Sequence, residues 1–508
     1  MTLRPLLLLL ATTFASAPLA SPFSAPLGQD QHLDPTPRTA SEQARITAVT
    51  RPTTDFSKAE RFEQLSAGAA SSPASASEKV FKLPSANMAF ERKMQFVLGE
   101  ALFEKLWVSS PSSTKASDGV GPLYNARSCA RCHPGAGRGT PPLPQKRARS
   151  FFLRLSIPGG TAPEGIDGYI PDQPEPTYGR QLQNVAVGAL PPEGQPAVRY
   201  EETLIELADG TVVHLRKPHY QVDDPGYGPL HPQAMLSPRV AQQMIGLGLL
   251  ESIPAQAILD HADPEDADGD GISGRAQIVT SEIWGEPMLG RFGHKAGAAT
   301  VYRQSAGAFH GDVGISSPLF PQGYGECTAQ QVDCRTAPDG NSIANDGLEI
   351  GGDAMDAVSF YAENLAVPMR RKVNDPSVLR GKELFYQSGC IACHRPKFVT
   401  HRLEDRPEQS FQLIWPYTDL LLHDMGEGLA DHRPEARANG YEWRTAPLWG
   451  IGLTRQVSGH TYFLHDGRAR NLLEAILWHG GEASQAQQRV IQMPAADRDA
   501  LIEFLQSL

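Results

Sequence analysis

The sequence predicts a mainly α-helical protein of two similar domains, with a β-rich insert of strands and loops in the first. Apolar residues recur at helical spacing before residue 107, over residues 237–253 and 347–365, and again at the C-terminus. From about residue 150 to 235 the pattern changes to short β-like runs, with Asp209-Gly210 as a turn signal. The motif C-x-x-C-H occurs twice, at residues 129–133 and 390–394, which indicates two related units.

Composition is typical of a soluble globular protein and makes nucleic acid an unexpected partner. Hydrophobic residues are 40% of the chain and charged residues 20%, which is enough apolar material for a buried core. The 46 Lys and Arg against 57 Asp and Glu give a formal charge of −11, and no long basic run is present. After the first twenty residues no apolar run reaches the roughly 18 residues of a membrane helix, so we expect no membrane span.

The N-terminus has the layout of a secretory signal peptide. Arg4 precedes an apolar stretch that starts at Leu6, and small residues follow up to Ala20. We therefore expect residues 1–20 to be a signal peptide and the mature protein to be periplasmic. Residues 21–87 are rich in Ser, Ala and Pro and predict a leader or wrapping arm. In that oxidising compartment Cys327 and Cys334, seven positions apart, are expected to form a disulfide.

The remaining four cysteines indicate the chemistry. In C-x-x-C-H the two thiols add to haem vinyl groups, and the adjacent His is placed to coordinate the iron. A Cys₄ zinc site or a redox-active disulfide would also use Cys pairs, but neither explains a His directly after the second Cys in both copies. We expect two covalently bound haem c groups, held by Cys129, Cys132, His133, Cys390, Cys393 and His394.

Two such motifs predict two cytochrome c-like domains. We expect the N-terminal haem domain over residues 88–375, with the β-rich insert at about 150–235, and the C-terminal haem domain over residues 376–508. A weak internal sequence repeat agrees with this division. Residues 291–296 (R-F-G-H-K-A) and 463–469 (F-L-H-D-G-R-A) each lie downstream of one Cys pair and run into an amphipathic segment.

Residues 266–272, D-A-D-G-D-G-I, match the first half of a calcium-binding loop. Carboxylates at alternate positions can converge on one ion, and glycine allows the sharp turn. Position twelve, where a complete EF-hand has Glu, is Gln277. We expect a structural Ca²⁺ within residues 263–273; a solvated acidic turn is the alternative. The predicted ligands are Asp266, Asp268, Asp270 and the carbonyl of Ile272, with Asp263 or Ser273 as further candidates.

The function of each haem depends on the second axial position of its iron. A second strong ligand makes an electron-transfer haem, whereas an open position permits chemistry on peroxide. His479 stands beside an apolar helical stripe that includes Leu472 and Ile476, so it is the candidate ligand. Met425 is its competitor. The chemistry alone does not choose an acid or base among the 57 acidic residues.

Several longer motifs are similar to those of known di-haem enzymes. Residues 463–467 (F-L-H-D-G) and 443–448 (W-R-T-A-P-L) resemble the C-terminal domain of bacterial di-haem cytochrome c peroxidases. Residues 118–126, 289–293, 420–429 and 478–483 resemble the di-haem oxidoreductase ("putative peroxidase") family, once labelled thiol oxidoreductase. The resemblance covers roughly residues 88–508.

The resemblance implies roles for individual residues. It makes His479, fourteen positions after His465, the distal ligand of the C-terminal haem, where the peroxidases have Met. It implies Gln304 as a hydrogen-bond donor and Asp312 as an acid/base at the N-terminal haem. His294 occupies the place of a Trp that commonly lies between the haems. Three roles for it stay open: electron relay, ligand of the first haem, or hydrogen bond to a propionate.

The resemblance implies a peroxidase-like oxidoreductase. A small periplasmic redox protein would donate electrons to the C-terminal haem, and the N-terminal haem would reduce peroxide or another small oxidant. A pure electron-transfer protein is an alternative, and His294 or His310 as a sixth ligand would favour it. A long-range oxidase of a protein or organic substrate is another.

Overall fold

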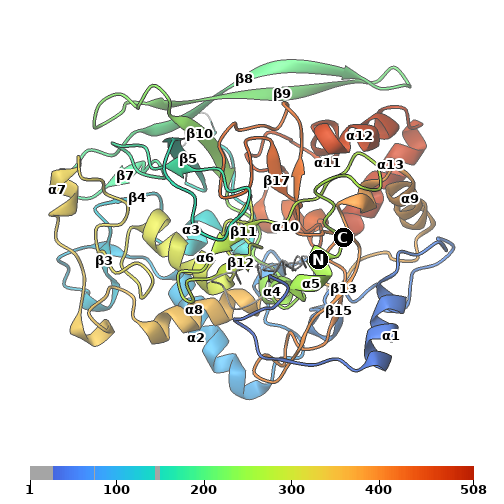
Figure 1. The fold of residues 1–508 in the computed structure, drawn as a ribbon, viewed down its shortest axis with the longest axis horizontal. Helices are drawn as coiled ribbons and strands as arrows, with labels where there is room; N and C mark the ends of the chain where they lie inside the picture. Colours follow the sequence, from blue (N-terminus) through green and yellow to red (C-terminus); the bar gives the residue numbers. More distant parts are fainter. Residues whose placement is uncertain (1–26, 74, 144–148) are drawn as a thin grey trace, which may run out of the picture.

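The computed structural model describes residues 27–73, 75–143 and 149–508, so the predicted signal peptide lies outside the described residues. The N-terminal and C-terminal halves lie side by side, and a long hairpin runs across one edge of both (Figure 1). Among the described residues, no helix combines the length and the apolar character needed to cross a membrane.

The prediction of a mainly α-helical protein is wrong. Helices make up 29% of the chain and strands 18%, and the strands form many small sheets. Long connections link these elements, and two- to three-stranded sheets hold them in place. The many Gly and Pro residues explain this result, because both interrupt helices and favour turns.

The α-helices of the described residues are mostly short. They are α1 (Ala40–Thr50), α2 (Lys93–Glu104), α3 (Cys129–Cys132), α4 (Leu247–Glu251), α5 (Ala255–Leu259), α6 (Val301–Ala308), α7 (Val332–Arg335), α8 (Gly352–Glu363), α9 (Pro376–Gln387), α10 (Thr454–Ser458), α11 (Leu472–Leu477), α12 (Ser484–Ile491) and α13 (Ala495–Ser507). A π-helix, Phe309–Val313, directly continues α6.

The strands are mostly two or three residues long. They are β1 (Pro35–Thr36), β2 (Val108–Ser109), β3 (Asp118–Val120), β4 (Leu123–Tyr124), β5 (Phe151–Pro158), β6 (Asp172–Gln173), β7 (Val185–Ala186), β8 (Gln195–Glu206), β9 (Val212–Asp223), β10 (Met235–Val240), β11 (Ile278–Thr280), β12 (Pro287–Leu289), β13 (Phe398–Val399), β14 (Arg402–Leu403), β15 (Leu413–Ile414), β16 (Leu422–Asp424) and β17 (Glu442–Arg444).

Each half contains a pair of helices that cross at a glycine. In the first half α2 packs on α8, and a Cβ on Gly99 would lie 2.1 Å from the Ala357 carbonyl oxygen. In the second half α9 packs on α13, and a Cβ on Gly381 would lie 1.9 Å from the Ala500 carbonyl oxygen. Only glycine permits backbones to approach so closely.

The β-rich region reaches from the first half onto the second. Strands β8 and β9 form an antiparallel hairpin of twelve residues each, which extends over the C-terminal helices (Figure 1). Leu207 and Leu215 of this region belong to the apolar core of the C-terminal half. Tyr220 Oη donates to Asp466 Oδ2 at 2.7 Å. The helix predicted over residues 237–253 is wrong at its start, because β10 pairs with β5 and helix begins only at Leu247.

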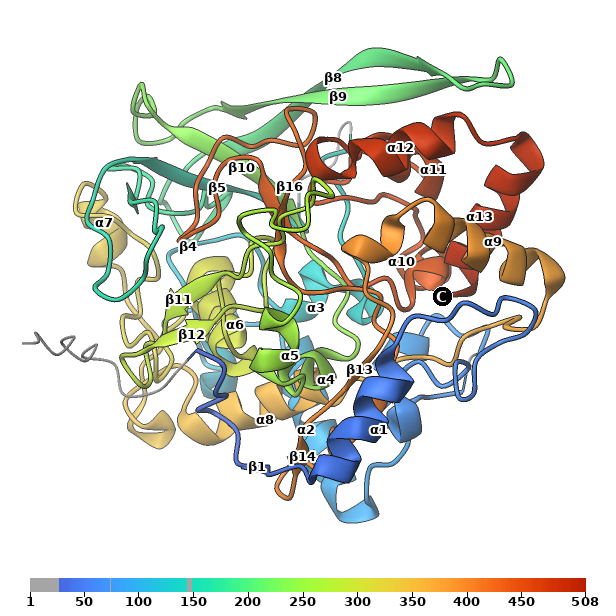
Figure 2. The same ribbon diagram turned by 45° about the vertical axis from the view of Figure 1, so that its right-hand side comes forward.

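The segment before α2 lies against the outside of both halves, with α1 beside β13 (Figure 2). Glu63, which is 1% exposed, forms ion pairs with Arg370 and with Lys382, the latter at 2.8 Å. Glu60 pairs with Lys382 at 2.9 Å and with Lys397 at 2.5 Å. This N-terminal segment therefore neutralises cations buried in the C-terminal half.

Replacing Glu63 with Gln should destabilise the protein by about 3–5 kcal/mol, because it leaves Arg370 and Lys382 buried without their shared counter-ion. Chemical denaturation at pH 7 measures the change in the free energy of unfolding. Glu91→Gln, at an exposed position, is the control and should change it by less than about 0.5 kcal/mol. Equal stabilities of the two variants would contradict the prediction.

Candidate functional site

One large cavity, of about 950 Å³, is lined by both C-x-x-C-H segments and by residues of both halves. Its size is at the upper end of the range usual for pockets that enclose organic ligands. All the residues predicted to hold or serve the haems line it: Cys129, Cys132, His133, His294, Gln304, Asp312, Cys390, Cys393, His394 and His479. The fold thus brings together side chains that are separated by up to 350 positions in the sequence.

The three predicted iron ligands share one hydrogen-bonding arrangement. Nδ1 lies 2.6 Å from the Gln242 carbonyl oxygen in His133, 2.9 Å from that of Tyr417 in His394, and 2.7 Å from that of Ala475 in His479. Burial lowers the pKa of all three imidazoles, to about 4 for His394. A neutral ring that donates its Nδ1 proton to a carbonyl keeps the Nε2 lone pair available to a metal. These side chains fit haem iron.

The four cysteines outside the disulfide do not form a zinc site. Among the described residues, the only group of three or more His, Cys, Asp or Glu side chains whose donor atoms all lie within 4.8 Å of one another is Asp263, Asp266 and Asp268. Burial raises the pKa of Cys129 and of Cys390 to about 12, which makes them poor redox thiols. The disulfide predicted between Cys327 and Cys334 is confirmed.

The wall nearest the first C-x-x-C-H segment carries the predicted acid/base. Helix α6 and the π-helix after it place Gln304 and Asp312 on the cavity lining. Asp312 Oδ1 accepts a hydrogen bond from Gln181 Nε2 at 2.7 Å. Burial raises the pKa of Asp312, while Arg154 and Gln181 oppose the rise. A buried carboxyl with a raised pKa is suited to proton transfer near neutral pH.

Trp443 joins two histidines on the cavity wall. Its ring stacks on His465 with centroids 3.8 Å apart and meets His294 edge-on at 6.3 Å. His294 Nε2 lies 2.9 Å from the Val240 carbonyl oxygen, so this nitrogen already has a partner in the protein. Sequence reasoning gave Trp443 no role, although the residue lies within one of the motifs that carry the resemblance.

A second group that sequence reasoning missed surrounds His423, which also lines the cavity. Its Nε2 lies 2.9 Å from Asp419 Oδ2, and its Nδ1 lies 2.6 Å from Glu482 Oε2 and 3.4 Å from Cys393 Sγ. Burial disfavours the charged ring, yet the pKa of His423 is raised well above its usual value, above all by Asp419. The two carboxylates therefore favour a positively charged imidazole beside the second C-x-x-C-H segment.

The predicted calcium loop lies next to this group. Ser273 Oγ donates to Glu482 Oε1 at 2.7 Å, and Asp270 and Ile272 line the cavity. The carboxylates that lie close together are those of Asp263, Asp266 and Asp268, and Asp270 is outside this group. Calcium binding at the loop stays a prediction.

The comparisons with known proteins decide the family. The family model described as "Di-haem oxidoreductase, putative peroxidase" matches residues 63–508. The chain belongs to this di-haem oxidoreductase family. The resemblance seen in the sequence is confirmed, and membership indicates haem cofactors and a redox role for the protein.

Other comparisons add little to the di-haem oxidoreductase assignment. A hydrazine synthase of Kuenenia stuttgartiensis is similar to this chain at 16% identity and a TM-score of 0.22. The match covers 36% of this chain and 63% of that one, which is less than two thirds of its length. None of the curated proteins compared matches the chain.

His423→Gln should destabilise the protein by about 3 kcal/mol at pH 6, because it leaves buried Asp419 and Glu482 without their cation. A histidine with a raised folded pKa adds stability that is full below about pH 6.5, its unfolded pKa, and is lost as pH rises through the folded pKa. The difference from the wild type should therefore narrow at alkaline pH, as measured by denaturation at several pH values.

His432→Gln is the control for His423→Gln. His432 is 56% exposed and pairs with Glu427 at 3.3 Å on the surface, where such a pair contributes at most about 1 kcal/mol. A loss of stability from His423→Gln that does not vary with pH would contradict the assigned charge.

Proposed function

We propose that this protein is an exported, peroxidase-like oxidoreductase with two covalently bound haem c groups. One observation carries the proposal: both C-x-x-C-H segments, His479 and the Asp312 carboxyl line the same cavity. Family membership supports it. The signal-peptide pattern of residues 1–20 supports a periplasmic location, and a bound Ca²⁺ at residues 263–273 belongs to the same proposal.

Each Cys pair and the histidine that follows it would bind one haem. Cys129 and Cys132 would attach one haem, with His133 as its ligand. Cys390 and Cys393 would attach the other, with His394 and His479 as its two ligands. When bound, the haem groups supply electron storage and an iron coordination site at which peroxide can be reduced.

Peroxide reduction to two waters requires two electrons and two protons. A small periplasmic redox protein is the proposed electron donor. Asp312 would accept a proton from the incoming peroxide and return it to the oxygen that leaves as water. Gln304, on the same wall, would orient the ligand through its amide. The Gln181 amide holds the Asp312 carboxylate in place at 2.7 Å.

Removal of one Cys pair should remove one haem only. Cys129→Ala with Cys132→Ala, and Cys390→Ala with Cys393→Ala, should each reduce covalently bound haem from two per chain to one, because a thioether needs the thiol. Pyridine haemochrome absorbance and haem staining of a denaturing gel measure the result. A wild-type chain that releases its haem on denaturation would contradict covalent attachment.

The peroxidase rate should depend on the protonation of Asp312. Because the carboxylate form accepts the proton, the rate should fall as pH falls through the raised pKa of Asp312. Gln181→Leu removes a donor that favours the carboxylate, so it should shift this acidic limb to higher pH. Asp312→Asn should lower kcat by about 10²- to 10⁴-fold. Steady-state rates against pH test all three expectations.

Gln183→Leu is the matched control for Gln181→Leu. Gln183 Nε2 donates to the Gly311 carbonyl oxygen at 2.7 Å and has no hydrogen bond to Asp312 among the described residues. Its pH profile should therefore follow that of the wild type. If Gln181→Leu also leaves the profile unmoved, Asp312 does not act in its carboxylate form.

A further inference from the structure

The weak internal repeat of the sequence, residues 291–296 and 463–469, is a repeated backbone unit in the structure. Phe292 forms a β-bridge with Ala298, and Phe463 forms one with Ala469, at the same separation. The residue after each Phe has a positive φ, 84° at Gly293 and 69° at Leu464. Such values are rare for leucine. The two segments therefore follow the same unusual path.

The match continues into the helices without an insertion. The Thr300 side chain caps α6 by accepting from the Arg303 N–H, and the Asn471 side chain caps α11 by accepting from the Glu474 N–H. Both caps stand two residues after the bridged alanine, and each accepts from the residue three positions on. The shared bridges, dihedral angles and caps define a single alignment of the two units, in which Phe292 corresponds to Phe463.

The two units also meet the same tryptophan. His294 in the first and His465 in the second occupy equivalent places, and their rings contact Trp443 from different directions. The His294 carbonyl oxygen accepts from the Arg444 N–H, and that of His465 accepts from the Val240 N–H. The two turns are therefore equivalent in their backbone path and also in their hydrogen bonds to the other half of the molecule.

In this alignment Ala308 occupies the place of His479. Four residues earlier Gln304 corresponds to Ala475, and four residues later Asp312 corresponds to Ala483. All six of these residues line the cavity. In the second unit a histidine therefore stands between two alanines, whereas in the first unit an alanine stands between an amide and a carboxyl.

This reversal has a direct chemical consequence. His479 offers Nε2 to a metal, because its Nδ1 is engaged with the Ala475 carbonyl oxygen at 2.7 Å. The methyl group of Ala308 cannot coordinate anything. His310, the nearest histidine to it in sequence, also lines the cavity, with its ring stacked on Phe320 at 4.7 Å. Its equivalent in the second unit is Gly481, so His310 does not stand at the place of His479.

We propose that Ala308 is the residue that keeps the second axial position of the N-terminal haem free for a small exogenous ligand, flanked by Gln304 and Asp312. The same place in the C-terminal unit is closed by His479. The inference rests on the proposed function only in requiring haem at both C-x-x-C-H segments. The ligand class is a small molecule of the size of peroxide, and cyanide, an ion of similar size that binds ferric iron through carbon, is the probe for the same position.

The test counts ligand sites on the oxidised holoprotein. Low-temperature EPR gives the spin state of each haem, and optical titration with potassium cyanide gives the number of ions bound per chain. The wild type should show one high-spin haem and bind one cyanide. Ala308→His should bind none and show two low-spin haems. His479→Ala should bind two. Ala308→Leu, which adds bulk without a ligand atom, should remain high-spin at one haem.

Other results would overturn the inference. If the wild type has two low-spin haems and binds no cyanide, and His310→Ala then binds one cyanide, His310 is the ligand. His479→Ala that still binds one cyanide would show that the two places are not equivalent. The cyanide count does not depend on turnover. A protein that binds one cyanide but does not reduce peroxide would contradict the proposed function and leave this inference standing.

Discussion

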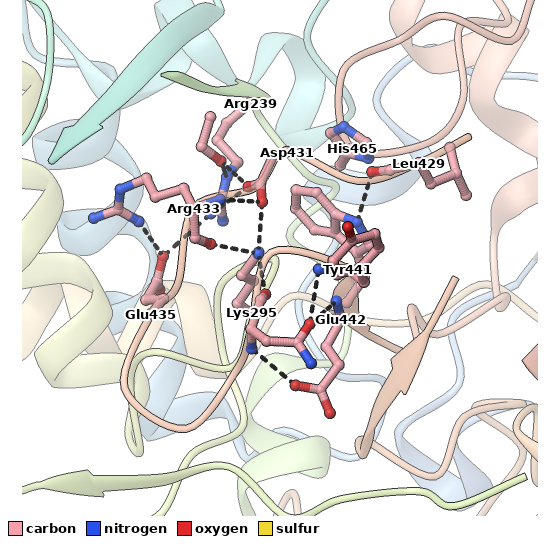
Figure 3. A network of polar contacts seen from close by, with 12 residues as sticks. Arg239, Lys295, Leu429, Asp431, Arg433, Glu435, Tyr441, Glu442 and His465 are labelled. Atoms are coloured by element: carbon pink, nitrogen blue, oxygen red, sulfur yellow. Dashed lines mark hydrogen bonds and ion pairs between the residues drawn. The ribbon is translucent and has the colours of Figure 1, made fainter. Parts of the chain in front are cut away.

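The contact between the two halves at Trp443 depends on one ion pair whose side chains are fully removed from water. Lys295 Nζ donates to Asp431 Oδ1 at 2.8 Å and to the carbonyl oxygens of Arg433 and Asn439 at 2.8 and 2.7 Å (Figure 3). Desolvation costs several kcal/mol per charge. This cost is offset here because every N–H of the Lys295 ammonium group has an acceptor. The pair joins the turn that carries His294 to the loop before Trp443. Lys295 also lies 4.7 Å from the Trp443 ring centroid, so the same cation positions the aromatic contact between the halves.

The two repeated units show how one backbone path can carry two different sets of side chains. Capping and left-handed turn residues place α6 and α11 on the cavity wall in the same register. At three corresponding positions the side chains then differ: Gln304, Ala308 and Asp312 in the first unit stand where the second unit has Ala475, His479 and Ala483. A fold can in this way keep its packing while its sites diverge, because packing depends on the buried faces and chemistry on the few residues that face the ligand.

Local motifs were predictable, whereas packing between distant segments was not. The C-x-x-C-H spacing and the Cys327–Cys334 pairing could be read from the residues. The family resemblance implied Gln304 and Asp312 at the first C-x-x-C-H segment and His479 at the second, and the structure places all three on one cavity. The helix expected over residues 237–253 was wrong at its start because its helical period competes with pairing to β5, whose partner residues lie more than 80 positions earlier. Periodicity does not report such long-range pairing.

The sequence by itself determined the family, because the motifs that carry the resemblance are short contiguous patterns that can be recognised without the fold. Only the tertiary structure decided that Trp443 lies between two histidines, that His423 is held by Asp419 and Glu482, and that Glu63 neutralises Arg370. Such contacts join residues far apart in the chain. Their partners are selected by burial, since a charge or ring removed from water is stable only where complementary groups surround it.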